Sequence, residues 1–182
     1  LVLGYLERRV EYDAHLGNLD GILRCLAAGL TVTSLETCRR RYLARHPETE
    51  GHSVLHLATG DAFRSAGHLP EALASCRRSI ELAPENATGH AGLATALEAM
   101  GQLDEAIASY RKAVEHDGAN SVLHNNLGNA FINNNQLDEA ITVLRKAVEL
   151  DPKRVENYAA LGAVYVAAGQ FSDAESAYRQ AT

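Results

Sequence analysis

The chain has 182 residues, and 17 Lys plus Arg against 23 Asp plus Glu give it a formal charge of −6. An apolar content of 46% fits a folded protein rather than a disordered one. The acidic balance, with only 5% aromatic residues and no Trp, argues against a nucleic-acid-binding protein, because neutralising phosphates requires a basic surface.

Residues 1–52 differ from the rest in charge, since they hold seven basic and seven acidic residues and leave the net negative charge to residues 53–182. Two stretches, 18–30 and 34–46, have helical periodicity. We expect residues 1–52 to form an N-terminal helical segment, either a degenerate repeat or capping helices, with a separate accessory helical domain as the alternative. The basic tract Arg39, Arg40, Arg41 and Arg45 could attract an anionic partner, but a solvated surface is the simpler interpretation.

The cysteines bear on the compartment. Cys25, Cys38 and Cys76 are odd in number and include no CxxC pair, which favours a reducing environment, and we predict a cytoplasmic protein. The longest apolar run, residues 159–169, is about half of the ~20 residues that a bilayer span needs, so we expect no membrane insertion. The chain begins at Leu1 and stops inside a helical pattern, so we expect it to be part of a longer protein.

Residues 53–182 repeat themselves with a period of 34. Small residues, large apolar residues and helix-ending residues each recur in register. The aligned rows are Gly60, Ala94, Gly128 and Gly162; Ala72, Ala106, Ala140 and Ala174; Phe63, Leu97, Phe131 and Tyr165; and Pro84, Gly118 and Pro152. A period of this length is typical of stacked helical repeats, each of which buries its apolar face against its neighbours.

This pattern resembles that of the tetratricopeptide repeat family, in which an aromatic residue, Leu-Gly, Tyr, Ala, Phe and a late Pro follow at fixed offsets. The third copy shows it with His124, Leu127, Gly128, Phe131, Ala140, Leu144 and Pro152. The resemblance implies an all-α fold, a right-handed superhelical solenoid of stacked helix-turn-helix repeats. The four expected repeats are residues 53–86, 87–120, 121–154 and 155–182.

Local signals place the helix ends and the outer face. Gly67, Gly101, Asn135 and Gly169 are of the types that accept a left-handed turn after a helix. Asp104, Asp138 and Ser172 are predicted to be N-caps of the second helices, and Pro70 to lie in the first turn of its helix. On those helices, ion pairs are expected for Arg77 with Glu81, Arg111 with Glu115, and Arg145 with Glu149.

Catalytic and metal-binding patterns were sought among the eight His and the Ser, Cys and acidic residues. His56, His90 and His124 lie one repeat apart, and helices packed 8–10 Å apart cannot bring three such rings to one zinc ion. Cys76 occupies the Phe position of its repeat, where a buried role is expected. No nucleophile elbow, P-loop or dinucleotide fingerprint occurs. We therefore expect no enzyme, no catalytic residue, no metal and no cofactor.

In the tetratricopeptide family the first helices line a concave groove that holds segments of other proteins. Carried onto this sequence, the resemblance implies a partner-binding face that is neutral to acidic and rich in Asn in the third repeat. The candidate residues are Leu57, Asp61, Arg64, Ala91, Thr95, Glu98, Asn125, Asn126, Asn129, Ile132, Asn133, Ala159 and Ala163. Arg64 is the only base among them, which argues against a carboxylate clamp of the kind found in chaperone-binding members. Asn126 matches the position of the Asn ladder in O-GlcNAc transferase, although Ala58, Gly92 and Ala160 do not continue it.

The leading hypothesis is a scaffold or adaptor that binds a protein or peptide partner in the groove, since Asn offers a peptide main chain both a donor and an acceptor. One alternative is a substrate-recruiting arm of a larger enzyme, such as a glycosyltransferase similar to O-GlcNAc transferase. A second alternative is a self-assembling scaffold, and thus a homo-oligomer. For Asn133 in particular, a role in ending its helix competes with binding.

Overall fold

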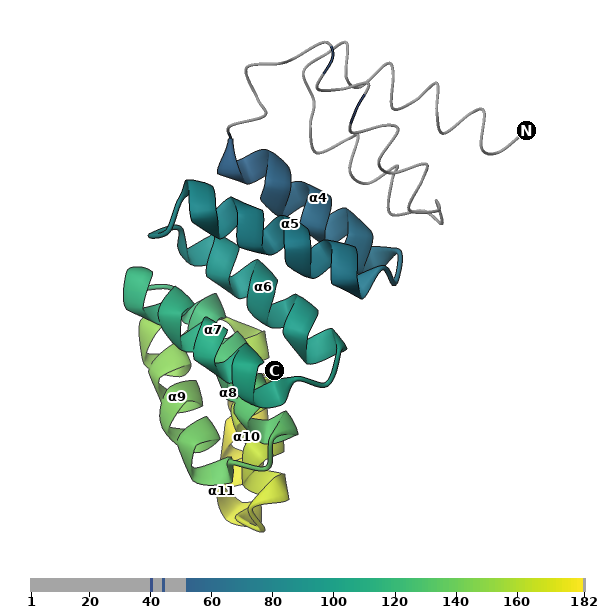
Figure 1. Ribbon diagram of the computed structural model, residues 1–182. Helices are drawn as coiled ribbons and strands as arrows, with labels where there is room; N and C mark the ends of the chain where they lie inside the picture. The colour runs from purple at the N-terminus through teal and green to yellow at the C-terminus, as the bar shows by residue number, and fades with distance from the viewer. Residues whose placement is uncertain (1–39, 41–43, 45–51, 182) are drawn as a thin grey trace, which may run out of the picture. The chain divides into compact units, whose positions relative to one another are not determined.

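The computed structural model describes residues 40, 44 and 52–181 (Figure 1). Of the first 51 residues, only 40 and 44 are described, so the predictions for the N-terminal segment, for its arginine tract and for Cys25 and Cys38 lie outside the described residues. The chain divides into two compact units, Leu1–Met100 and Gly101–Thr182. The division falls within the second predicted repeat, and the predicted domain and repeat boundaries stay predictions.

The described part of the N-terminal unit consists of three helices that contact one another. Helix α4 packs against both α5 and α6, and α5 also packs against α6. The core between them is formed by Leu55, Phe63, Leu73, Cys76 and Leu97. The helices are α4 (Ser53–Ser65), α5 (Leu69–Leu82) and α6 (Ala87–Ala99).

The C-terminal unit stacks five helices in chain order. Helix α8 packs against α7, α9 and α10, while α10 also contacts α9 and α11. Leu127, Phe131, Leu144, Leu161 and Val164 form the largest part of its core. The helices are α7 (Leu103–His116), α8 (Ser121–Asn133), α9 (Leu137–Leu150), α10 (Val155–Ala167) and α11 (Phe171–Gln180). The described residues contain no strand, and the predicted class, an all-α solenoid of helix-turn-helix units, is confirmed.

The tight turn inside each helix pair has the predicted residue in a left-handed conformation. Gly67, Gly101, Asn135 and Gly169 have φ of 81°, 76°, 57° and 73°. This conformation brings a Cβ close to the following carbonyl, so Gly adopts it without cost and Asn tolerates it better than most residues. The prediction of these four turns is confirmed.

The glycine row of the repeat marks the closest approach of paired helices. A Cβ added to Gly60 would lie 2.7 Å from Cys76 Sγ, one on Gly128 would lie 2.5 Å from Leu144 Cδ2, and one on Gly162 would lie 2.7 Å from the Tyr178 ring. Real Cβ atoms do not come this close to other heavy atoms. In these three helix pairs, glycine therefore lets the first helix come into contact with a side chain of its second helix.

The predicted N-caps of the second helices are wrong. Helices α7, α9 and α11 begin one residue before Asp104, Asp138 and Ser172, and their N-caps are Gln residues whose side chains make no cap hydrogen bond. The acids instead lie in the first turn, where free N–H groups and the helix dipole stabilise negative charge without a capping bond. Pro70 does lie in the first turn of α5, as predicted.

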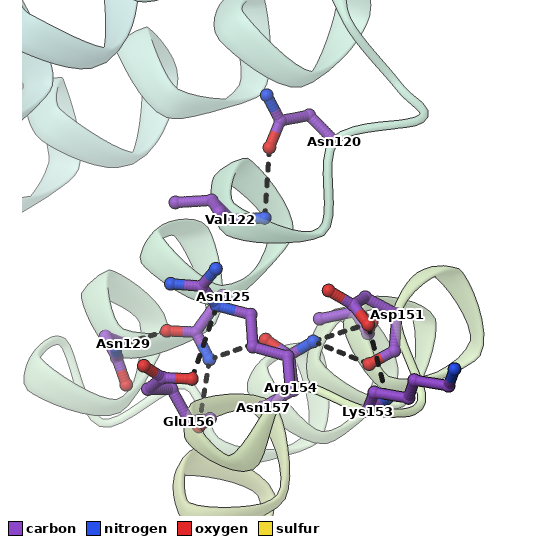
Figure 2. Close-up of polar contacts among 10 residues, drawn as sticks. Asn120, Val122, Asn125, Asn129, Asp151, Lys153, Arg154, Glu156 and Asn157 are labelled. Atoms are coloured by element: carbon purple, nitrogen blue, oxygen red, sulfur yellow. Dashed lines mark hydrogen bonds and ion pairs between the residues drawn. The ribbon is translucent and has the colours of Figure 1, made fainter.

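Two first helices, α6 and α8, are capped by residues that the sequence analysis did not select. Asn86 precedes α6 and accepts a hydrogen bond from the Thr88 N–H. Asn120 precedes α8 and accepts one from the Val122 N–H, as Figure 2 shows. The two Asn residues are one period apart, whereas His52 and Arg154, which precede α4 and α10, make no side-chain cap bond. Such caps each stabilise a helix by about 1 kcal/mol.

The three ion pairs predicted on the second helices also need correction. Glu81 pairs with Arg78 at 2.8 Å and Glu149 pairs with Lys146 at 3.0 Å. Arg111 and Arg145 instead lie over the rings of Phe131 and Tyr165, at 5.4 and 5.8 Å from the ring centres. A guanidinium over an aromatic face gains about as much as an exposed ion pair does, so helical spacing alone does not decide between the two.

Candidate partner-binding site

The first helices of the C-terminal unit place the predicted residues on neighbouring faces. Side chains three and four positions apart share one side of a helix, so α8 aligns Val122, Asn125, Asn129 and Ile132, and α10 lies against α8. Val122 and Val166 expose 37% and 46% of their surface. We call Val122, Asn125 and Asn129 of α8 together with Ala163 and Val166 of α10 the α8–α10 face.

The predicted residues of this unit differ in exposure. Asn133 and Ala163 are exposed, Asn126, Asn129, Ile132 and Ala159 are half-buried, and Asn125 is buried, with 9% of its surface exposed. Most of these side chains are therefore accessible from the surface, whereas that of Asn125 is not.

Asn125 connects the two helices of this face (Figure 2). Its Nδ2 donates to the Glu156 carbonyl oxygen at 3.2 Å and to Asn157 Oδ1 at 3.3 Å. Its Oδ1 accepts a hydrogen bond from Asn129 Nδ2 at 3.1 Å. The amide of Asn125 thus links α8 to α10, while Asn129 remains half-buried beside it.

Asn157 is the polar residue that the sequence analysis missed. It is fully buried, and its Nδ2 donates to the carbonyl oxygens of Ala147 and Asp151 at 2.9 and 3.2 Å. Leu55, Gly89 and Leu123 hold the same place in the earlier repeats. An Asn in an otherwise nonpolar row was the available signal, because a buried amide persists only where its hydrogen bonds are made.

The N-terminal unit presents a more charged face. Asp61 is exposed and pairs with Arg64 at 3.6 Å, and Arg64 Nε is buried without a hydrogen bond to the described residues. On α6, Ala91, Thr95 and Glu98 are half-buried, and Thr95 Oγ1 donates to the Ala91 carbonyl oxygen at 2.9 Å.

Leu57 joins the two first helices of this unit through apolar contact. The Leu57 side chain lies so close to α6 that a Cβ on Gly92 would come within 2.6 Å of its Cδ1. Leu57 is half-buried, so its outer part also contributes apolar surface to this face.

Cys76 lies beneath the charged face and is buried. The pKa of its thiol is raised from the ordinary value of 9.0 to about 11, mainly by burial and also by the negative charge of Asp61, while the positive charge of Arg64 acts in the opposite direction. The thiol stays protonated at neutral pH and is therefore a poor nucleophile. This agrees with the packing role predicted for Cys76.

The periodic histidines hold the turns between repeats. His90 Nε2 lies 2.8 Å from the Pro84 carbonyl oxygen and His124 Nε2 lies 3.0 Å from that of Gly118. Because a carbonyl only accepts, Nε2 carries the proton in both rings. These bonds give His90 and His124 a structural role, as predicted. No group of three or more His, Cys, Asp or Glu within the described residues could hold a metal ion.

An open hollow of about 330 Å³ lies away from the predicted residues, between α7, α8 and α9. Its floor is apolar and its rim carries both signs of charge. The lining residues are Arg111, Leu127, Phe131, Asp138, Glu139, Thr142 and Val143. In the described part of the chain, no helix is both long and apolar enough to cross a bilayer.

Comparison with sequence families gives a repeat match over most of the chain. Models of the tetratricopeptide repeat match residues 57–121, 99–164 and 134–182. A serine/threonine-protein kinase, Pkn1 of Myxococcus xanthus, is 43% identical over 82 residues, which are 45% of this chain and 12% of the kinase. The match thus spans about an eighth of that relative.

Solved structures agree on the fold. BtubC from P. vanneervenii superposes with a TM-score of 0.78 at 19% identity, covering 98% of this chain and 87% of that one. MamA from Desulfovibrio magneticus RS-1 gives 0.70 at 19%, covering 99% and 93%. PilF from Pseudomonas aeruginosa gives 0.66 at 24%, covering 71% and 59%. At such identities the likeness concerns the fold alone.

Proposed function

Because the chain belongs to the tetratricopeptide repeat family, whose members bind protein partners, we propose that it is an interaction scaffold that holds a partner segment on its first helices. The observation that carries this proposal is the α8–α10 face. On this face Val122 and Val166 are exposed and the amide of Asn129 is half-buried. Exposed apolar side chains together with a hydrogen-bonding group suit an extended peptide.

The charge of this face favours a neutral segment. Arg154 is engaged with Glu156 at 3.5 Å, and none of the predicted residues on α8 and α10 is basic. A partner anchored by a carboxylate would therefore find no counter-charge. We expect shallow apolar contacts and hydrogen bonds to provide most of the affinity.

Selection from a random 12-residue peptide library tests the proposal. Peptides selected on the wild type should lose binding to Val122→Asp/Val166→Asp, because the carboxylates would be desolvated against apolar side chains. The control variant, Ala108→Asp/Thr142→Asp, changes two exposed residues of the second helices α7 and α9 and should keep binding. If only the control variant loses binding, the peptides bind the second helices α7 and α9, and the proposal is contradicted.

A second candidate function follows from the kinase relative. The 43% identity with part of a serine/threonine-protein kinase favours a repeat segment that recruits substrates or regulators for a catalytic domain elsewhere in one protein. It corresponds to the alternative of a substrate-recruiting arm of a larger enzyme, with a kinase as that enzyme. Reading the gene on both sides of these 182 residues tests it: a kinase domain in the same frame supports the idea, and a frame without one contradicts it.

Three predictions stay open beside these proposals: the absence of catalysis within the chain itself, its cytoplasmic location and its self-assembly. Light scattering over a concentration series tests the last of them, because the mean mass grows with concentration only if copies associate.

A further inference from the structure

The hollow between α7, α8 and α9 is large enough for an aromatic side chain. Its volume is about 330 Å³, whereas a cavity of about 150 Å³ is enough to hold a benzene ring. Leu127 and Phe131 of α8 form its apolar floor and are buried. Arg111, Asp138 and Glu139 are exposed and form its rim. The hollow thus combines an apolar floor with polar groups that solvent can reach.

The arginine of the rim lacks a hydroxyl group that the next repeat supplies. Arg111 and Arg145 are one period apart. Arg145 lies over the ring of Tyr165, and its Nε donates to the Tyr165 hydroxyl at 2.9 Å. Arg111 also lies over a ring, but this ring belongs to Phe131 and has no oxygen to accept a hydrogen bond. The chain therefore shows which group fits beside such a guanidinium, and the hollow is missing it.

An acid of the rim lacks a donor in a similar way. Asp104 and Asp138 are one period apart, and Asp104 Oδ1 accepts a hydrogen bond from Asn134 Nδ2 at 2.9 Å. In the next repeat the position of Asn134 is occupied by Ala168, whose side chain has no N–H to offer Asp138. A donor and an acceptor at the hollow thus lack the neutral partners that their counterparts have within the same unit.

The mixed charges of the rim favour a neutral occupant. A cation would be attracted by Asp138 and Glu139 but repelled by Arg111, and the reverse holds for an anion. A neutral group that both accepts and donates a hydrogen bond suits both signs. Of the side chains Phe, Trp and Tyr, Phe does neither and Trp only donates, whereas the Tyr hydroxyl does both. A Tyr ring also supplies the apolar body that the floor of the hollow requires.

We propose that the hollow holds a tyrosine side chain of a partner protein, with the ring on the apolar floor and the hydroxyl at the rim. The hydroxyl accepts a hydrogen bond from Arg111 and donates one to Asp138 or Glu139. It does for Arg111 what the Tyr165 hydroxyl does for Arg145. Phosphorylation of the partner's tyrosine would bring a charge of about −2 beside two carboxylates and should release it.

This site is independent of the function proposed for the first helices. Its walls are formed by the second helices α7 and α9, and none of its lining residues belongs to the α8–α10 face. A partner segment on the first helices and a tyrosine in the hollow can therefore be tested one without the other.

NMR titration with capped amino acids tests the proposal, because the caps remove terminal charges that a residue within a protein does not carry. N-acetyl-tyrosinamide should shift the methyl resonances of Leu127 and Val143, which line the hollow. N-acetyl-phenylalaninamide should bind about three- to tenfold more weakly, the size of one hydrogen bond. The phosphorylated form of the capped tyrosine should bind more weakly than the unphosphorylated form. Equal affinities of the capped tyrosine and phenylalanine would overturn the role of the hydroxyl.

Phe131→Tyr is the matched variant, since it supplies the missing hydroxyl from within the chain. Its hydroxyl should accept from Arg111 and reduce the preference for the capped tyrosine to less than about twofold. The control Tyr165→Phe deletes the corresponding hydroxyl one repeat later and should keep the full preference. Circular dichroism checks that both variants are as helical as the wild type. If Phe131→Tyr keeps the full preference, Arg111 does not bind the hydroxyl and the proposal fails.

The remaining outcomes separate this site from the scaffold proposal. Val122→Asp/Val166→Asp changes only the α8–α10 face and should keep both the resonance shifts and the preference for tyrosine. Loss of both in that variant would assign the tyrosine to the α8–α10 face and overturn this inference. If free tyrosine, with both terminal charges, binds more tightly than the capped form, the occupant is a free amino acid and the docking of a partner is overturned. If neither Leu127 nor Val143 shifts, the inference fails and the scaffold proposal stands.

Discussion

Within each unit, one side chain connects two neighbouring first helices. The two side chains occupy the same position of the repeat, but one contact is apolar and the other is a set of hydrogen bonds. Leu57 and Asn125 are 68 residues apart, which is two periods of 34, and each reaches from one first helix to the next. Leu57 packs against α6 where Gly92 leaves room, whereas Asn125 hydrogen-bonds to Asn157 and Glu156. The repeat therefore determines where neighbouring helices meet and leaves the kind of contact free.

The difference matters because the two chemistries respond differently to change. An apolar junction accepts any apolar side chain of suitable volume. An amide junction requires its complementary partner, since a buried donor or acceptor without one is costly. The C-terminal unit consequently has a more specific junction, and this junction lies beside the α8–α10 face.

The largest expected effect comes from breaking the amide junction on one side. Asn125→Leu leaves Asn157 Oδ1 buried without a donor and should lower the free energy of unfolding by about 2 kcal/mol. Asn125→Leu/Asn157→Leu removes both partners and should be closer to wild type, because Ala147 and Asp151 keep backbone donors for their carbonyls. Urea unfolding followed by circular dichroism measures both variants.

The matched change in the N-terminal unit is Leu57→Met. It conserves volume at an apolar junction and should cost under about 1.5 kcal/mol of the free energy of unfolding.

If the costs of Asn125→Leu and Asn157→Leu simply add in the double variant, the amides are not coupled and the contrast between the junctions is wrong.

A smaller effect should appear with pH, through Cys76 of the N-terminal unit. Cys76 and Leu144 share one register position, but only the thiol titrates. Because its pKa is raised to about 11 when folded, Cys76 contributes stability below pH 9 that is lost as the pH rises from about 9 to about 11. From pH 8 to 10 the loss should be roughly 1.4 kcal/mol.

Cys76→Ala provides the control for this prediction. Denaturation at several pH values should show a shallower decline for the variant than for wild type. Equal slopes would mean that the thiol titrates alike in the folded and unfolded states.

The smallest effect concerns the arginines of the second helices. Arg77 and Arg145 share a register position, yet Arg145 lies over Tyr165 and donates to its hydroxyl at 2.9 Å, while Leu97 replaces the ring in the N-terminal unit. Arg145→Gln should cost about 0.5–1 kcal/mol, and Arg77→Gln less than about 0.5 kcal/mol. Thermal unfolding of the two variants side by side tests the difference, and equal shifts would contradict it.

Much of the fold could be predicted because its signals are local or periodic. The left-handed turns at Gly67 and Asn135 follow from backbone sterics, and the close approach at Gly128 follows from a small residue that recurs every 34 positions. The N-caps were misplaced because Asp and Ser favour both the cap and the first turn of a helix, which lie within one or two residues of each other. The ion pairs were misplaced because the spacing of residues along one helix does not predict an aromatic ring on a neighbouring helix, such as that of Phe131 or Tyr165.

The candidate site was less predictable. The family pattern gave the positions of Asn125 and Asn129 but not their different roles, since burial depends on what α10 brings against α8. Asn157 lay outside that pattern. Its importance depends on the end of α9, ten residues earlier in sequence, whose carbonyl oxygens it satisfies.

The sequence by itself determined the period, the helix pairs and the turns, because each depends on residues within one repeat or on the same register in the next. Only the tertiary structure decided that Asn125 is a buried link between α8 and α10 and that Asn129 donates to it from a half-buried position. Hydrogen bonds have direction, and the directions of these bonds depend on carbonyl groups of α9 and α10 that come near α8 only when the helices pack.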